Sequence, residues 1–221
     1  MNGSDVWMET EYLDLTLSKS RIYPFFKRIL DLLMVSIAVI LLLPIFLLLS
    51  ILVKVTSKGP VIYKHKRVGK NGREIYLYKF RTMVSDADNF DKYFTKRELK
   101  KFKENYKLEN DPRITKLGKI LRRTSLDELP QLFNILKGDM ALIGPRPVVE
   151  EELEYFKENK EIILSILPGL TGWWACNGRS CRTYDDRVKL EAYYVKNMSF
   201  KLDIKCFMKT IITVIKKEGA K

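Results

Sequence analysis

The sequence is poor in the residues that build metal sites and disulfide frameworks. Its 221 residues include one histidine, His65, and three cysteines, Cys176, Cys181 and Cys206. These residues make no zinc-binding constellation. Three cysteines are also too few for a disulfide-dense secreted scaffold. We therefore expect reduced thiols in a chain that faces the cytoplasm.

The sequence also has fewer acidic than basic residues. The chain carries 40 Lys and Arg against 27 Asp and Glu, which gives a formal net charge of +13. Such a charge attracts anionic lipid, nucleotides or nucleic acid, and by itself it does not distinguish among them. No internal repeat, low-complexity tract or cleavable signal peptide is evident. The length allows one domain and an anchor, without room for two independent cores.

Charged side chains are missing altogether between Leu32 and Val53. A straight helix over this stretch rises about 33 Å, enough to cross a hydrocarbon core of roughly 30 Å. Lysines and arginines flank both ends, which is typical of cytoplasmic flanks, and Pro44 near the middle favours a bend. We predict a re-entrant helix that dips into one leaflet, with a spanning helix that tolerates its proline as the alternative. Asp31 is expected to pair with Arg28 at the interface.

The anchor divides the chain into three segments. Residues 1–25 form a polar N-terminal extension, residues 26–54 the re-entrant membrane helix, and residues 55–221 a domain on the cytoplasmic face. Because the basic charge follows a membrane segment, it favours lipid head groups and phosphorylated substrates over nucleic acid.

The domain is expected to be α+β and mostly helical. Two β-rich runs around the turn at residues 69–72 predict a small β-hairpin. Residues 86–109 indicate a solvated helix or a mobile loop, and residues 114–121 have helical spacing. Apolar residues interleaved with lysines from 193 to 217 predict an interfacial amphipathic helix, or alternatively one packed on the core.

The segment 122–133 carries the most chemistry. Ser125 and Glu128 have the spacing of a capping box, and apolar residues at 129, 132, 133 and 136 follow at helical spacing. Pro130 has no backbone N–H to donate to an intrahelical hydrogen bond. The alternative is therefore a helix that starts at that proline. In both readings two carboxylates, Asp127 and Glu128, lie at a helix entrance.

These carboxylates suit phosphoryl transfer. Asp127 is a competent nucleophile toward phosphorus, and Glu128 beside it can help to hold a Mg²⁺ ion that neutralises a diphosphate. Helix N-terminal amides and basic side chains would receive the developing negative charge. Arg122 and Arg123 are expected to keep the pKa of Asp127 low. The alternative is that these carboxylates only cap a helix and have no catalytic function.

Two rigid motifs follow downstream. In Gly144-Pro145-Arg146-Pro147 the prolines hold an arginine on a non-helical loop, where its guanidinium suits a phosphate or carboxylate, or is simply solvated. Trp173 and Trp174 follow a Pro-Gly-Leu-Thr-Gly run. They are candidates for stacking on a base, for the membrane interface, or for the core.

Together these motifs resemble the bacterial sugar transferase family, the monotopic polyprenol-phosphate phosphoglycosyl transferases. The resemblance covers roughly Phe26 to the C-terminus. It rests on the following segments, in order: Lys79-Phe80-Arg81-Thr82-Met83, residues 125–133, Lys137-Gly138-Asp139-Met140, Gly144-Pro145-Arg146-Pro147, Pro168-Gly169-Leu170-Thr171-Gly172-Trp173, Asn177-Gly178-Arg179 and Tyr193-Tyr194-Val195-Lys196-Asn197.

The resemblance implies an enzyme of the bacterial inner membrane, on its cytoplasmic face. Such an enzyme transfers a phospho-sugar from a UDP-sugar to undecaprenyl phosphate, releases UMP, and starts the assembly of a surface glycan. Asp127 would be the nucleophile that forms a covalent phospho-sugar intermediate. Glu128 would bind Mg²⁺ with it or activate the lipid phosphate. The phosphate- or nucleotide-binding positions are Lys79, Arg122, Arg146 and Arg179.

Two positions depart from the common family pattern. Leu43 stands where many members have a serine before the membrane proline, and Cys176 stands where many have a glutamine. The transferred sugar and the formation of a homo-oligomer stay open. The rival hypotheses are a non-catalytic membrane-anchored scaffold and a tethered nucleic-acid binder.

Overall fold

The structure is a computed structural model that describes residues 22–105, 108, 110–178 and 183–215. It is an α+β fold dominated by helices, with two small two-stranded sheets. The predicted α+β, mostly helical class is confirmed, and the re-entrant course of the membrane helix stays a prediction.

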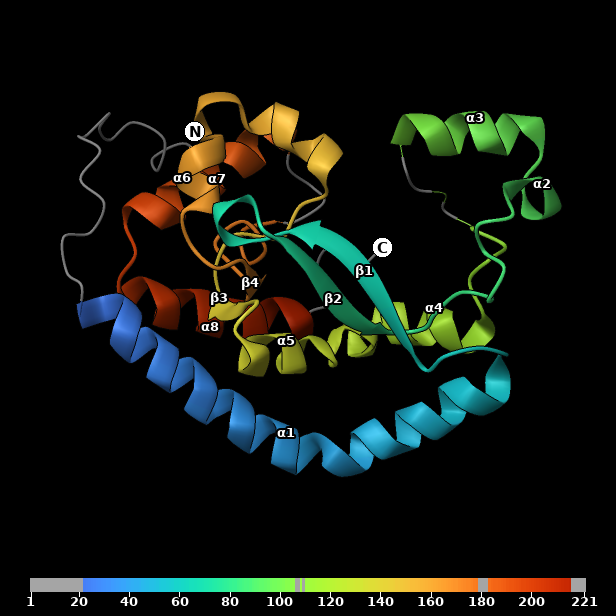
Figure 1. Cartoon of the computed structure of the whole chain (residues 1–221), viewed down its shortest axis with the longest axis horizontal. Helices are drawn as coiled ribbons and strands as arrows, with labels where there is room; N and C mark the ends of the chain where they lie inside the picture. The colour runs from blue at the N-terminus through green and yellow to red at the C-terminus, as the bar shows by residue number, and fades with distance from the viewer. Residues whose placement is uncertain (1–21, 106–107, 109, 179–182, 216–221) are drawn as a thin grey trace.

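The membrane segment forms one long helix, α1 (Ile22–Thr56), with Pro44 inside it. The helix bends between its two halves (Figure 1), as expected where a proline removes a backbone donor and crowds the preceding turn. By length and composition α1 is able to cross a membrane, and most of its apolar side chains are exposed.

Both halves of α1 contact the same domain, which lies on the concave side of the bend (Figure 1). Near its start, the Tyr23 hydroxyl donates to Asp203 at 2.7 Å. In the second half, the Phe46 ring packs against Phe80 with centroids 6.0 Å apart. Just past the helix end, the carbonyl of Ser57 accepts a hydrogen bond from the Arg81 guanidinium at 2.6 Å.

The predicted pairing of Asp31 with Arg28 is wrong. Asp31 lies 3.8 Å from Lys27, one turn earlier, and also accepts the backbone N–H of Leu142. Arg28 instead donates to main-chain carbonyls of the domain. The difference arises because the domain covers this part of α1 and offers the arginine other acceptors.

The predicted hairpin is confirmed. Strands β1 (Ile62–Val68) and β2 (Glu74–Phe80) pair antiparallel, and the turn between them, η1 (Lys70–Gly72), has left-handed backbone at Asn71, with φ of 56°, and at Gly72. A second, parallel pair was not predicted. It joins β3 (Ala141–Ile143) to β4 (Gly169–Thr171).

The largest core cluster lies where α1, the hairpin and the helix α5 (Gln131–Lys137) meet. Its fully buried members are Val35, Val53, Phe80, Leu121, Ile135 and Met140. The membrane helix therefore supplies part of the core of the domain.

Residues 86–109 contain two helices, α2 (Phe90–Tyr93) and α3 (Lys96–Asn105), in agreement with the helical alternative. The next helix, α4 (Lys116–Arg123), begins at Thr115, whose side chain caps the N–H of Gly118. A Cβ at Gly118 would lie 2.0 Å from the carbonyl oxygen of Thr82. The glycine therefore allows α4 to lie directly against the segment that follows β2.

The C-terminal part is made of η3 (Glu150–Asn159), α6 (Lys160–Leu164), α7 (Tyr184–Lys196) and α8 (Phe200–Ile215). Helix α8 buries Leu202 and Cys206 in a core cluster, so the core-packing alternative holds for one of its faces. Another face exposes Ile204, Met208, Ile211 and Ile212. Membrane contact by that face stays a prediction.

Candidate active site

The two candidate carboxylates lie on a short 3-10 turn, η2 (Leu126–Glu128), between α4 and α5. Ser125 has left-handed backbone, with φ of 56°, and its side chain makes no capping hydrogen bond. The capping-box prediction is therefore wrong. Helix α5 begins after Pro130, which agrees with the alternative reading. The left-handed residue interrupts the helical backbone between α4 and α5, so the carboxylates lie on an irregular turn.

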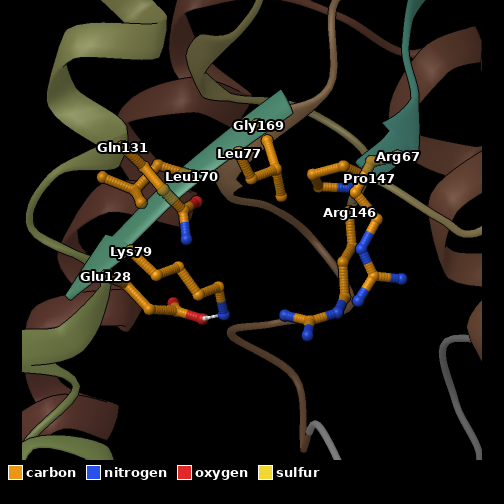
Figure 2. A pocket seen from close by; sticks show the side chains of 9 residues that line it. All are labelled: Arg67, Leu77, Lys79, Glu128, Gln131, Arg146, Pro147, Gly169 and Leu170. Atoms are coloured by element: carbon orange, nitrogen blue, oxygen red, sulfur yellow. Dashed lines mark hydrogen bonds and ion pairs between the residues drawn. The ribbon is translucent and has the colours of Figure 1, made fainter. Parts of the chain in front are cut away.

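Glu128 faces a basic residue of the hairpin. The Lys79 Nζ atom lies 2.6 Å from Glu128 Oε1, and both side chains are only partly exposed. The two line an open pocket whose space, solvent outside it included, amounts to about 290 Å³. This pocket brings together strands β1 and β2, turn η2, the start of α5, the Arg146 loop and β4. It is lined by Arg67, Leu77, Lys79, Glu128, Gln131, Arg146, Pro147, Gly169 and Leu170 (Figure 2).

Asp127 is buried beside this pocket and is not among the lining residues. Burial raises the pKa of Asp127 to about 6, because the charged form loses its hydration, and the charge of Glu128 raises it further. The charges of Lys79 and Arg122 lower this pKa without overcoming burial. The expectation of a low pKa is therefore wrong. At neutral pH the carboxylate is still mostly ionised.

The predicted arginines are placed differently. Arg146 lies in the pocket wall, on a loop whose backbone N–H donates to Glu191 Oε1 at 3.0 Å. Arg122 lies outside the lining, and its Nε atom donates to Thr82 Oγ1 at 2.9 Å. It acts on the site through its charge on Asp127. Arg179 lies outside the described residues.

The tryptophans contact protein side chains. The Trp173 ring stacks with Tyr193, and Lys209 Nζ lies 4.9 Å from its centroid. Trp174 lies next to Arg187, with the guanidinium carbon 4.9 Å from the ring centroid. Trp173 packs against a core cluster, so the core alternative holds for it.

Sequence reasoning missed Arg67 and Gln131 as pocket residues. A signal for Arg67 was present in the alternation of the hairpin. In an antiparallel pair, side chains two residues apart share a face. The register pairs Arg67 with Ile75, so Leu77 and Lys79, two and four residues on, share the face of Arg67.

Residues 22–217 match the bacterial sugar transferase family. The chain belongs to this family. It is 43% identical over 197 residues to the exopolysaccharide production protein ExoY of Sinorhizobium fredii, covering 88% of this chain and 87% of that protein. It is 42% identical over 200 residues to the undecaprenyl-phosphate galactose phosphotransferase of Salmonella typhimurium, covering 89% of this chain and 42% of that protein.

A third relative is the UDP-N-acetylgalactosamine-undecaprenyl-phosphate N-acetylgalactosaminephosphotransferase of Aeromonas hydrophila. It is 37% identical over 212 residues, which cover 93% of this chain and 47% of that protein. The chain thus spans less than half the length of several curated relatives that it matches.

Two adjacent carboxylates, Asp127 and Glu128, lie at the site of this sugar transferase. Within the described ranges, no three His, Cys, Asp or Glu side chains form a group that could hold a metal ion. This donor set fits Mg²⁺, which is commonly held by one or two carboxylates together with substrate phosphates and water. It does not fit zinc, which needs more protein ligands.

Proposed function

We propose that this chain transfers a phospho-sugar from a UDP-sugar to undecaprenyl phosphate. The products are undecaprenyl-diphosphate-sugar and UMP. The observation that carries the proposal is the pairing of a buried, titratable Asp127 with a pocket that presents Lys79 and two arginines. It is a site for anionic substrates beside a nucleophile, in a member of a family whose relatives are named for this transfer.

In the first step the Asp127 carboxylate attacks the β-phosphorus of the UDP-sugar. A bond forms between the carboxylate oxygen and phosphorus, the bond from phosphorus to the bridging oxygen breaks, and UMP leaves with that electron pair. In the second step a phosphate oxygen of undecaprenyl phosphate attacks the same phosphorus, and the Asp127 carboxylate is released. No net proton transfer is required when the phosphates are ionised.

The surrounding side chains support this chemistry. Lys79 and Arg146 offer positive charge to the phosphates, and charge in a partly buried site stabilises an anion more strongly than it does in water. Asp127 and Glu128 would hold a Mg²⁺ ion, whose charge offsets that of the diphosphate when it is bound. Glu128 has a second candidate role, the activation of the lipid phosphate.

We also propose that α1 is re-entrant and that the domain lies on the cytoplasmic face of the inner membrane. The contacts of both halves of α1 with one domain support this arrangement. A straight helix that spanned the bilayer would carry its two ends to opposite sides, out of reach of a single domain on one side. The apolar face of α8 and neighbouring lysines are expected to lie at the same surface.

Sequence similarity does not identify the transferred sugar, because relatives of comparable identity are named for galactose and for N-acetylgalactosamine. The decisive experiment is a UMP-release assay in lipid nanodiscs with a panel of UDP-sugars, Mg²⁺ and undecaprenyl phosphate. In parallel, the protein is incubated with a UDP-sugar labelled in the β-phosphate, without lipid acceptor. We expect label on the peptide that contains Asp127, and its release on addition of undecaprenyl phosphate.

The alternative is a non-catalytic scaffold of a glycan assembly complex. It predicts no UMP with any donor in the panel. Turnover without label on Asp127 would overturn the covalent mechanism and leave the transfer intact.

A further inference from the structure

Arg67 lies on the pocket wall opposite Glu128, and neither the motifs nor the family resemblance assigned it a role. Figure 2 shows Arg67 and Arg146 on one side of the pocket and the Lys79–Glu128 pair on the other. The two arginines come from separate elements. Arg67 is on strand β1, and Arg146 is on the loop that follows β3.

The Arg67 side chain is only 15% exposed, and its contacts leave it poorly neutralised. Its Nη1 atom is 3.9 Å from Glu152, and Nη2 is 3.4 Å from His65 Nδ1. Its buried Nε has no hydrogen-bond partner in the part of the chain that the structure describes. Glu152 is also shared, since it lies 3.3 Å from Arg187.

The charges around this wall add up to a local positive excess. The charges of three guanidinium groups, of Arg67, Arg146 and Arg187, act here beside those of two carboxylates, Glu152 and Glu191. Glu191 is fully enclosed, and burial raises its pKa to about 7, so it is only partly ionised near neutral pH. Burying uncompensated charge is costly, and a bound anion would offset that cost.

We infer that Arg67 is a substrate-binding residue that, together with Arg146, binds a phosphate group of a reactant. Two adjacent guanidinium groups present several N–H donors in fixed planes, a geometry that suits phosphate oxygens. The inference rests on the proposed function, which supplies two phosphate-bearing reactants, the UDP-sugar and undecaprenyl phosphate. Either one could present the phosphate group.

The Glu191 contact explains how Arg146 is held in place. Glu191, on α7, accepts the backbone N–H of Arg146 and so fixes the loop from inside the domain. Gly144 is constrained on the same loop, because a Cβ there would lie 2.6 Å from the Leu167 carbonyl oxygen. The loop is thus seated before substrate arrives, which reduces the entropy lost on binding.

The test compares Arg67→Gln and Arg67→Lys with Lys64→Gln in nanodiscs. Lys64 is exposed on the same strand, and its position in the alternation places it on the opposite face, so it controls for the loss of one positive charge. We expect Arg67→Gln to raise the KM for one phosphate substrate at least tenfold. Arg67→Lys should raise it less, since it keeps the charge and loses the planar fork, and Lys64→Gln should stay within twofold of wild type.

Two arms distinguish the sources of the phosphate. If the UDP-sugar is the ligand, covalent labelling without lipid acceptor requires more donor in Arg67→Gln. If undecaprenyl phosphate is the ligand, labelling is normal and only the release of label by the lipid requires more acceptor. Unchanged KM values for both substrates in folded Arg67→Gln would overturn the inference.

If Arg67→Gln does not fold, Arg67→Lys decides, and unchanged KM values in it overturn the inference. The wild-type protein separates this result from a failure of the proposed function. Absence of UMP release by the wild type refutes the function, whereas an active wild type with an indifferent Arg67 refutes only the role of Arg67.

Discussion

Two buried polar clusters of this protein differ in how well their atoms are paired. The anchor cluster joins α1 to the C-terminal helices and consists of Tyr23, Lys27, Tyr194 and Asp203. Asp203 accepts hydrogen bonds from the other three at 2.6 to 2.9 Å. In the described structure none of its buried side-chain polar atoms lacks a partner.

The pocket cluster lies around and behind the arginine wall and consists of Arg67, Glu152, Trp174, Arg187 and Glu191. Within the described residues it contains all the buried side-chain nitrogen and oxygen atoms that have no partner: Arg67 Nε, Trp174 Nε1, Arg187 Nε, Arg187 Nη2 and Glu191 Oε2. Unpaired buried polar atoms lower stability, so an arrangement that keeps them indicates a requirement other than stability. The full pairing of the anchor cluster is typical of a structural role, and the unpaired atoms of the pocket cluster support the proposal that Arg67 and Arg146 bind an anion.

The largest expected effect on the pocket side comes from Asp127→Asn. Removing the nucleophile should lower UMP release at least about 10³-fold. Covalent labelling should disappear, while membrane association and the unfolding transition persist. Labelling and turnover are measured on the same preparation. Retained turnover would show that Asp127 is not the nucleophile.

Asp203→Ala tests how much the anchor cluster contributes to stability. This change leaves Lys27 without its nearest carboxylate and should cost about 3 kcal/mol of unfolding free energy, as expected for a broken buried ion pair. Thermal unfolding in nanodiscs measures the loss. Lys201→Ala, at an exposed position on the same helix, should stay within about 0.5 kcal/mol of wild type.

The turnover of Asp203→Ala tests whether the anchor cluster also affects catalysis. UMP release per folded Asp203→Ala molecule should stay within a few-fold of wild type, because no residue of the anchor cluster lines the pocket. A variant with normal stability and lost turnover would break the distinction between the clusters.

A moderate effect is expected from pH. The pKa of Asp127 is raised to about 6, and only the ionised carboxylate attacks phosphorus, so the labelling rate should fall as the pH drops through 6. A Mg²⁺ ion bound to this carboxylate would lower its pKa, so the fall should move to lower pH as the Mg²⁺ concentration rises. The half-reaction with UDP-sugar is measured because the monoester phosphate of the lipid also titrates near this pH.

Glu191→Gln serves as the control for that profile. The pKa of Glu191 is raised to about 7, so its removal should leave the limb near pH 6 in place. If the labelling rate of Glu191→Gln no longer falls near pH 6, the titrating group is Glu191 in the wall of the pocket and not the nucleophile.

The smallest effect is expected at Ser125. Its left-handed backbone costs energy for a residue with a Cβ, and its side chain makes no capping hydrogen bond. Ser125→Gly should therefore be neutral or should stabilise the protein by up to about 1 kcal/mol. A loss of that size in thermal unfolding would restore the capping interpretation.

Sequence reasoning succeeded where neighbours along the chain decide the structure. The hairpin followed from two β-rich runs around a turn, and the bend in α1 from Pro44. It failed at Ser125 because capping boxes and left-handed turns use the same polar residues. It did not predict β3 and β4, whose three-residue strands carry too little pattern and pair across a long connection.

The candidate site shows the same contrast between what neighbouring residues indicate and what only distant contacts decide. The choice of Asp127, Glu128, Lys79 and Arg146 came from motifs, and the structure brings the last three to one pocket. The pKa of Asp127 was predicted in the wrong direction because adjacent arginines are visible in the sequence and burial is not. Arg67 was missed because its importance depends on which loops lie opposite the hairpin.

The sequence by itself determined an apolar helix with basic flanks, a mostly helical α+β domain, and a segment in which adjacent carboxylates follow two arginines. These properties depend on residue type and on spacing over a few turns or strands. The tertiary structure alone decided which carboxylate is buried, which cations face it, and which polar atoms stay unpaired. Such properties depend on contacts between distant segments, as between Tyr23 and Asp203, 180 residues apart, and no local pattern encodes the dielectric environment that these contacts create.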